Sequence, residues 1–386
     1  MNKLNSQAEA KTLEVAPTFA PGGYLSALLN AVDDGLETLA RGLRKRIVRP
    51  LTGLHGPGRF PALANFLRSL QGREDWPSVA AKRRRKLAQY LFRTLCMPRQ
   101  HLAYLAFVYG NPRMYAYQRR DPRLLERHFH RYIHLGWNHR AHLESIRQHY
   151  QFALSRLPGV LFEAVYIQGN ATLGSLTLKN GTQLQLCLRP PIFMGCEGEL
   201  CIQLNDANDH PVYRLILSVI DDRPSIAIGC IQGPVGEHGR ETVRELTRNM
   251  HGMRPKQLML SLAYAFAQHF GIERILAVSN AAHPLRRARE KFQADYDGFW
   301  LEQKGRQLAD GWFMLPETLS RKCESDVPSH HRSAFRRREA LRIEAERLLT
   351  HALEAHSMRK ITAPAGEALE SAESFQHDGL EPSWIR

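Results

Sequence analysis

The chain has 386 residues, of which 43% are hydrophobic, and its formal net charge is +15. A chain of this size can bury a sizeable core and is expected to fold as two units. Its six cysteines form no C-x-x-C pair, which argues against a disulfide scaffold. No apolar run reaches the roughly 18 residues that a membrane-spanning helix needs, and the first residues lack a signal-peptide pattern, so we expect a cytoplasmic protein.

The excess positive charge lies in the N-terminal part of the chain. Residues 1–150 contain 25 basic and 10 acidic side chains, whereas the remainder contains 28 of each. This asymmetry predicts an anionic partner, which could be a membrane surface, a small molecule or nucleic acid. No zinc finger, RNP-type strand or helix-turn-helix signature is present, and composition alone does not rank nucleic acid against a membrane surface. The sequence carries no signal for an oligomeric state.

The first part of the chain has a helical pattern. We expect residues 1–22 to be a flexible N-terminus and residues 23–157 to be a basic helical region, punctuated by proline and glycine. Residues 81–95 are strongly basic and predict an amphipathic helix. Its buried face is expected to follow the leucines at helical spacing, Leu87, Leu91 and Leu95.

Six of the eighteen histidines lie within residues 124–150. On a helix at 100° per residue, His130 and His134 fall opposite the apolar stripe, so we expect them to face solvent. A second helix, capped by Asn138, places His139 on its apolar side. Arginines interleave with these histidines and few carboxylates accompany them, so no metal site is expected.

The periodicity changes near residue 158 from helical to alternating. Asn180-Gly181 lies between two alternating runs and predicts a β-hairpin. Four more strands are expected at residues 198–204, 213–220, 225–231 and 275–280. Two helices are expected between the last two strands, at residues 240–250 and 255–270, the second beginning at Pro255 and ending before Gly271.

Together these elements predict an α/β (α+β) protein. A basic helical N-terminal region precedes a mixed, largely antiparallel sheet flanked by helices over residues 158–320. Residues 330–357 predict a charged helix, and residues 358–386, rich in Ala, Glu, Ser and Pro, predict a disordered tail.

The order of a strand, a glycine-containing turn, a helix and a second strand resembles the acyl-coenzyme A core of the GNAT acetyltransferase superfamily. In that family a glycine-rich loop between the fourth strand and the following helix holds the cofactor pyrophosphate. A helix N-terminus supplies backbone N–H groups and a positive dipole to such an anion. This chain departs from the family motif at Pro255, which removes one N–H donor. By position, the resemblance implies an acyl-coenzyme A loop formed by Gly252, Met253, Arg254, Lys256 and Gln257.

Acidic residues near this loop are candidates for acid–base chemistry. Glu197 and Glu199 are expected on the same side of a strand, and Asp295 and Asp297 likewise around Tyr296. Acylation of an amine needs a base that removes the amine proton, and these carboxylates are suited to that role. The same residues could instead be a salt-bridged strand edge and packing at its rim. A further candidate base is His251, which precedes the loop glycine.

Several motifs, in order and spacing, look like those of the VirK/YbjX family of bacterial proteins. The resemblance covers roughly residues 80–320. Members of that family are described as virulence-associated proteins of Gram-negative bacteria, linked to resistance to antimicrobial peptides and to envelope properties. The resemblance therefore implies a biological context without naming a reaction, and it makes a membrane surface a more expected partner than nucleic acid. The motifs are "QHYQF", "EGELCIQL", "IGCIQGP", "RELTRNMHGMRPKQL", "AVSNAAH" and "ADYDGFW".

Two functions from different classes follow from the sequence. The first is an acyltransferase-like protein that binds acyl-coenzyme A or a related anionic ligand and transfers an acyl group to an amine or hydroxyl. The second is a non-enzymatic envelope factor whose basic helices dock on anionic lipid, at the inner membrane, or on a partner protein.

Overall fold

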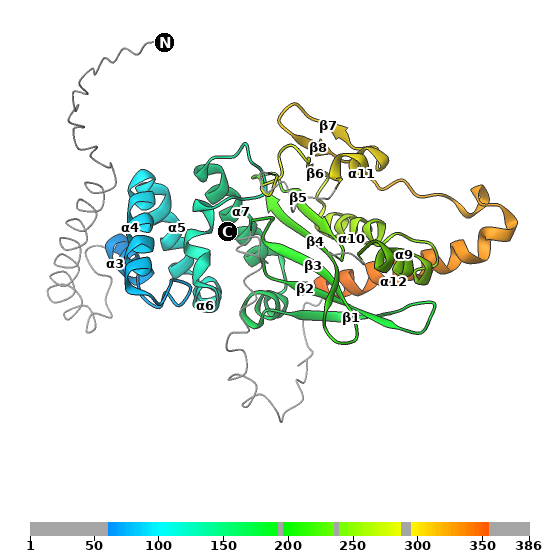
Figure 1. Ribbon diagram of the computed structural model, residues 1–386, viewed down its shortest axis with the longest axis horizontal. Coiled ribbons are helices and arrows are strands. Elements are labelled where there is room, and N and C mark those ends of the chain that lie inside the picture. The colour runs from blue at the N-terminus through cyan, green and yellow to red at the C-terminus, as the bar shows by residue number, and fades with distance from the viewer. Residues whose placement is uncertain (1–60, 192–195, 235–238, 287–294, 355–386) are drawn as a thin grey trace, which may run out of the picture.

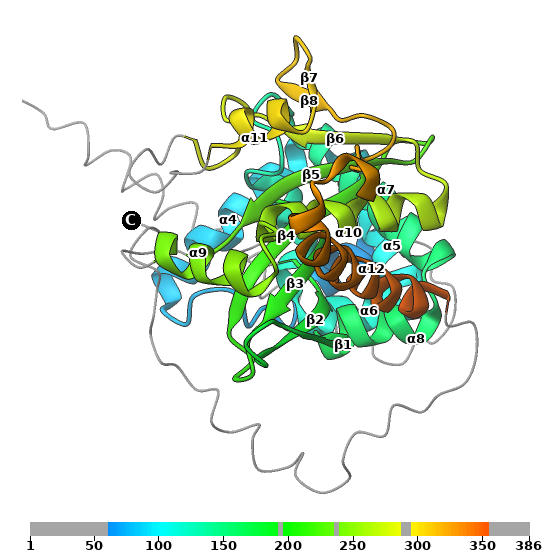
Figure 2. The same ribbon diagram turned by 90° about the vertical axis from the view of Figure 1, so that its right-hand side faces the viewer.

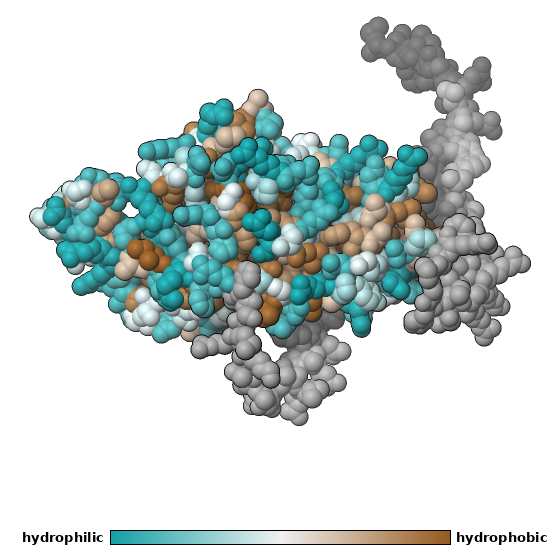
Figure 3. Space-filling view, turned by 180° about the vertical axis from the view of Figure 1, so that it is seen from behind, coloured by the Kyte–Doolittle hydropathy of each residue, from teal (hydrophilic) through white to brown (hydrophobic). Residues whose placement is uncertain are grey.

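The computed structural model describes residues 61–191, 196–234, 239–286 and 295–354. The expected flexible N-terminus and disordered tail lie outside these residues. Helices from the N-terminal part gather at one end of the molecule, and the strands extend away from them (Figure 1). Seen from behind, the surface is mainly hydrophilic, with apolar residues in scattered patches (Figure 3).

The N-terminal helices begin at residues whose chemistry favours helix starts. Proline occupies the first turn of three of them, where its missing N–H costs nothing. Three helices begin at a residue whose side-chain oxygen accepts hydrogen bonds from backbone N–H groups of the first turn. These residues are Asn111, Asp121 and Asn138. The elements are α3 (Pro61–Ser69), α4 (Ala80–Cys96), α5 (Pro98–Gly110), α6 (Pro112–Arg120), a 3-10 helix (Pro122–Phe129), α7 (His139–Arg156), α8 (Gly159–Phe162) and a π-helical turn (Glu163–Gln168).

The described strands form one eight-stranded sheet in the order β1-β2-β3-β4-β5-β6-β8-β7. Neighbouring strands pair antiparallel except β5 and β6, which are parallel. Parallel strands need a crossover connection, and here two helices supply it. The strands are β1 (Ala171–Thr177), β2 (Gln183–Arg189), β3 (Leu200–Asn205), β4 (Pro211–Ile220), β5 (Ser225–Gln232), β6 (Arg274–Val278), β7 (Arg306–Gln307) and β8 (Trp312–Met314).

Helices α9 (Gly239–Asn249) and α10 (Pro255–Phe270) connect β5 to β6, and α11 (Tyr296–Glu302) follows β6. Two 3-10 turns (Glu324–Asp326 and Ser329–His331) lead to α12 (Arg332–Glu354). Helix α12 contacts both α10 and β1, so the two helices lie together on one face of the sheet (Figure 2). Gly174 permits this approach, because a Cβ there would lie 2.6 Å from Leu348.

The predicted fold class is confirmed: the chain is a mixed α/β protein whose largely antiparallel sheet is flanked by helices. The Asn180-Gly181 hairpin, the four further strands and the helix starting at Pro255 are also confirmed. The predicted apolar face of residues 81–95 was wrong at Leu95, whereas Leu87 packs against the core as predicted. Helix α4 buries Tyr90 and Thr94, whereas Leu95 is 75% exposed.

Candidate functional site

The candidate site lies where the parallel strands β5 and β6 separate. Their register ends at the pair Ile228 and Ala277, whereas β5 continues to Gln232 along β4. Gly229, at the point of separation, is approached by the backbone of Glu197. A Cβ at Gly229 would lie only 2.0 Å from the Glu197 carbonyl oxygen. Glycine is therefore required for the loop before β3 to reach this point.

A buried histidine and a buried carboxylate meet at this separation. His283 Nε2 lies 3.1 Å from the Gly229 carbonyl oxygen and 3.3 Å from Glu197 Oε1. The Leu285 N–H donates to His283 Nδ1 at 3.2 Å, so the neutral ring carries its proton on Nε2. Because His283 is only 1% exposed, its orientation is fixed by these contacts.

Tyr296 and Cys230 extend the same cluster. The Tyr296 hydroxyl donates to Cys230 Sγ at 3.5 Å, and the Tyr296 ring stacks on His283 with centroids 5.4 Å apart. Burial raises the pKa of both Tyr296 and Cys230, so both are protonated at neutral pH. We call Glu197, Cys230, His283 and Tyr296 the mouth cluster.

The first turn of α10 brings positive charge beside this cluster. The Lys256 ammonium lies 5.3 Å from the centre of the Phe299 ring on α11. Burial lowers the pKa of Lys256, Asp295 works against that shift, and Cys230 is among its electrostatic neighbours. Arg254 forms an ion pair with Glu302 at the end of α11. The middle and the C-terminal end of α11 thus contact the start of α10.

In the loop before α10, much of the backbone hydrogen-bonding capacity is already occupied within the protein. Gly252 has φ +85°, a left-handed conformation that suits glycine. Its N–H donates to the Thr247 carbonyl at 2.8 Å, and the Met253 N–H donates to Met250 at 3.1 Å. The Gln257 N–H bonds back to Arg254 at 2.9 Å, and the Met253 side chain is buried. An anion at this loop would therefore be held mainly by side chains.

Asp295 and Asp297 are helix-start residues rather than strand residues, so the expected strand geometry was wrong. Asp295 Oδ1 accepts the Gly298 N–H at 3.0 Å and the Asn280 side-chain amide at 3.2 Å. Asp297 Oδ1 accepts the Asn280 backbone N–H at 2.7 Å. The Gly298 N–H bond lowers the pKa of Asp295, so this exposed residue stays ionised. Both carboxylates hold the β6 end against α11.

Glu197 and Glu199 do not share a strand face, contrary to the prediction. Strand β3 begins only at Leu200, and Gly198, with φ +142°, redirects the chain between the two carboxylates. Glu199 is fully buried and accepts hydrogen bonds from Arg127 and Tyr150 of the helical part. Its burial raises its pKa, and Arg127 acts to lower it. Glu199 therefore joins the two parts of the chain and lies outside the mouth cluster.

His251, the other candidate base, lies apart from these acids. It has φ +55°, and its charged neighbours are Arg337 and Lys179. Partial burial, followed by Arg337 and Lys179, lowers its pKa. These neighbours are cationic, so His251 belongs to a separate basic surface near the β1–β2 turn.

The histidine-rich segment corrects two expectations. Residues 122–129 form a 3-10 helix and residues 130–138 form a loop, so the 100° wheel does not apply. His134 is 5% exposed and stacks on Trp312, and His130 is also largely covered, whereas His139 is exposed. In the described part of the chain, no three or more His, Cys, Asp or Glu side chains are placed to hold a metal ion.

Comparison with known proteins identifies the family. The family described as "Protein of unknown function (DUF535)" matches residues 80–348. The chain belongs to the DUF535 family. No solved structure matches it. Within the described residues, no helix is both long and apolar enough to cross a bilayer.

Relatives of this DUF535 chain include "Uncharacterized protein YbjX" of Escherichia coli strain K12. It is 29% identical over 284 residues, which cover 72% of this chain and 86% of the relative. The VirK/YbjX resemblance is thereby confirmed. An "Uncharacterized protein" of Haemophilus influenzae is 27% identical over 51% of this chain and 66% of its own length. "Membrane protein LapB" of Mannheimia haemolytica is 36% identical over 17% of this chain and 29% of its own length.

Sequence reasoning missed His283, Cys230 and Asn280 in this DUF535 chain. A usable signal existed for two of them, because Asn280 and His283 follow the buried parallel strand β6, and open α/β sheets bind ligands beyond the carboxyl ends of such strands. The contact between His283 and Gly229 spans 54 residues of sequence, which no local pattern reveals.

Proposed function

We propose that the protein binds an acyl-coenzyme A, or a related anionic acyl donor, where β5 and β6 separate, and transfers its acyl group to an amine or hydroxyl. The observation that carries this proposal is the register: the parallel pair ends at Ile228 and Ala277 while β5 continues, and Lys256 at the start of α10 contacts Phe299 of α11, the helix that carries Tyr296. The ligand would lie between the strands where they separate.

The strand order supports the resemblance to the acyl-coenzyme A core of the GNAT superfamily. A parallel strand pair, joined through a helix whose N-terminus faces the separation, is the arrangement that resemblance implies. The departures at Pro255 and at the occupied N–H groups of Gly252 and Met253 change how the phosphates are held. The dipole of α10 and the Lys256 ammonium would supply the attraction, with Arg254 exchanging Glu302 for phosphate.

The mouth cluster would supply the proton transfer. Glu197 would accept the proton of the acceptor amine or hydroxyl as its nitrogen or oxygen bonds to the acyl carbon. The carbon–sulfur bond of the thioester then breaks, and the sulfur leaves with the proton returned from Glu197, which restores the carboxylate. His283 would hold Glu197 in position through their 3.3 Å contact. Tyr296 would orient the departing sulfur with its hydroxyl.

A thermal-shift titration with coenzyme A and acyl-coenzyme A of increasing chain length tests this proposal. Binding to the folded state alone stabilises it by about 2.7 kcal/mol at 100 times the dissociation constant. We expect stabilisation of the wild type and none of Lys256→Glu. Arg244→Glu is the matched control, because Arg244 is exposed on α9 and this substitution changes the charge by the same amount as Lys256→Glu. The absence of any shift in the wild type across all chain lengths would refute the proposal.

Membership of the VirK/YbjX family supports a proposal for the acceptor of this reaction and for the location of the protein in the cell. Members of that family are associated with virulence, antimicrobial-peptide resistance and envelope properties, so the proposed acceptor is an amine or hydroxyl connected with the envelope. We place the protein in the cytoplasm, peripheral at the inner membrane. A fractionation that recovers it wholly in the periplasm would contradict this placement.

A specific surface favours a second candidate function, docking on anionic lipid. Helix α4 exposes the basic run Lys82–Arg85, and the same helix exposes Phe92 (68%) and Leu95 (75%). Cationic and apolar side chains exposed together suit the headgroup boundary of an anionic leaflet. The matched relative from Mannheimia haemolytica bears the name "Membrane protein LapB", which agrees with this candidate.

Vesicle flotation separates the two candidates. The wild type should float with vesicles that contain phosphatidylglycerol and not with pure phosphatidylcholine. A Phe92→Ser, Leu95→Ser variant should lose flotation and keep its coenzyme A stabilisation. Equal flotation of wild type and variant would remove α4 as the docking surface.

A further inference from the structure

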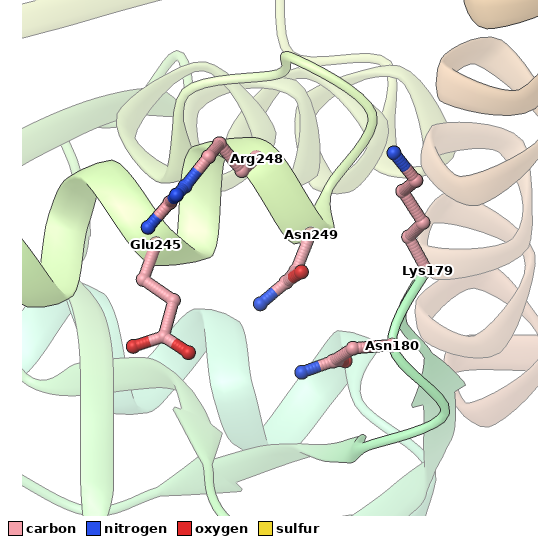
Figure 4. Close-up of a pocket in the computed structure, with 5 residues that line it drawn as sticks. All are labelled: Lys179, Asn180, Glu245, Arg248 and Asn249. Atoms are coloured by element: carbon pink, nitrogen blue, oxygen red, sulfur yellow. The ribbon is translucent and has the colours of Figure 1, made fainter.

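A pocket of about 390 Å³ opens between the turn of the β1–β2 hairpin and the end of α9. Five polar side chains line it, and no part of the proposed acyl transfer uses them (Figure 4). Its volume falls in the range of small-molecule sites, roughly 300 to 1,000 Å³. The lining residues are Lys179, Asn180, Glu245, Arg248 and Asn249.

The walls of the pocket are held in place by backbone bonds. The Lys179 N–H donates to the Asn249 carbonyl at 2.9 Å, which ties the hairpin turn to the end of α9. Asn180 Oδ1 accepts from the backbone and hydroxyl of Thr182 at 3.2 and 2.7 Å. That arrangement leaves the Asn180 amide nitrogen for a ligand. The pocket is thus formed before any ligand enters.

The charge around the pocket is positive. Lys179 comes from the hairpin and Arg248 from α9, and His251 with Arg337 of α12 lies near Lys179. Arg248 lies 3.8 Å from Glu241, a distance that leaves the arginine able to turn toward an anion. Two cations, one from the hairpin and one from α9, therefore line the pocket, and this favours a ligand with a negatively charged group.

Hydrogen-bond acceptors and amides line the middle of the pocket. Figure 4 shows the Glu245 carboxylate and the amides of Asn180 and Asn249 directed toward the same space. The carbonyls of Thr247 and Asn249 at the end of α9 already accept backbone N–H groups, so the acceptors of the pocket are side-chain oxygens. Carboxylate and amide groups together match the hydroxyls of a sugar, which both donate and accept.

We infer that this pocket binds a phosphorylated sugar, with the phosphate on Lys179 and Arg248 and the free hydroxyl or hydroxyls of the sugar among Glu245, Asn180 and Asn249. Two sources share this chemistry. One is the 3′-phosphorylated ribose of coenzyme A, and this source rests on the proposed function. Arg248 of α9 and Lys256 of α10 belong to the same connection between β5 and β6, and this source requires one long ligand to extend from the pocket to the mouth cluster. The other is a free sugar phosphate.

Calorimetry with coenzyme A, dephospho-coenzyme A and ribose 5-phosphate tests the pocket. We expect the wild type to bind coenzyme A about tenfold more tightly than dephospho-coenzyme A, because a charge-assisted phosphate contact is lost in the latter. Arg248→Glu should abolish this preference. Arg244→Glu, which also faces Glu241 but lies outside the pocket, should retain it. Lys179→Ala provides a second variant in the hairpin.

Each outcome separates the pocket from the acyl-donor proposal. Equal binding of coenzyme A and dephospho-coenzyme A, with Lys256→Glu abolishing both, overturns the pocket and leaves the donor site. Binding of ribose 5-phosphate alone, lost in Arg248→Glu, supports the pocket as a sugar phosphate site and removes the donor proposal. Equal weakening by Arg248→Glu and Arg244→Glu overturns the pocket, because general charge would then explain the binding. A wild type that binds none of the probes overturns both.

Discussion

Mild acid should destabilise this protein through its buried histidines. Burial lowers the pKa of His101, His130 and His142 to about 4 and that of His149 to about 3. In the unfolded chain the same rings have a pKa of about 6.5. Between these values the unfolded state binds more protons than the folded state, so stability falls as the pH falls.

The magnitude follows from the two pKa values. At pH 5.5 each histidine favours the unfolded state by about 1.4 kcal/mol, and the four together by roughly 5 to 6 kcal/mol, which approaches the whole stability of many domains. The penalty is nearly absent at pH 7.5. Glu199 acts in the opposite direction, because its pKa is raised by burial and its folded form gains protons as the pH falls.

Urea unfolding at pH 7.5 and pH 5.5 measures this difference. We expect a large fall in the free energy of unfolding of the wild type between pH 7.5 and pH 5.5. The fall should be smaller by about 1.4 kcal/mol in His130→Gln, because glutamine does not titrate. His210→Gln is the control, because the His210 side chain is 76% exposed. Equal midpoints at the two pH values, or an undiminished fall in His130→Gln, would refute the reasoning.

Three further predictions concern packing. Arg127→Met leaves Glu199 buried without its cation and should cost about 3 to 5 kcal/mol in urea unfolding, whereas adding Glu199→Gln should recover part of the loss. Gly229→Ala should displace the backbone of Glu197 and abolish the stabilisation by coenzyme A. Gly252→Ala has open space around the new Cβ, so it should lower the free energy of unfolding by only about 1 kcal/mol, because alanine is disfavoured at a positive φ. Tyr296→Phe should lower unfolding stability by about 1 kcal/mol, because a buried hydrogen bond to sulfur is lost.

Local chemistry made much of the fold predictable. The Asn180-Gly181 turn sets a hairpin by its backbone preference, and Pro255 and Gly271 mark the two ends of α10 for the same kind of reason. The exposed Leu95 and the buried His134 were missed because burial there depends on which distant element covers the residue. A helical wheel supplies no such information.

The candidate site was predictable only in part. Tyr296 and Lys256 were found from their motifs, and the structure brings both beside Cys230. Glu199 was assigned to the wrong group because one glycine with positive φ turns the chain before β3. His283 reaches the site through a contact between distant segments, which depends on strand order rather than on local sequence.

Hydrogen exchange with and without an acyl-coenzyme A tests the central claim most directly, because it locates the ligand on the chain. The account predicts slower exchange at residues 229–232, where β5 leaves β6, and at the start of α10, with no change in α4. Those are the segments that line the separation of the strands. Unchanged exchange in both segments at saturating ligand, or protection confined to α4, would contradict it.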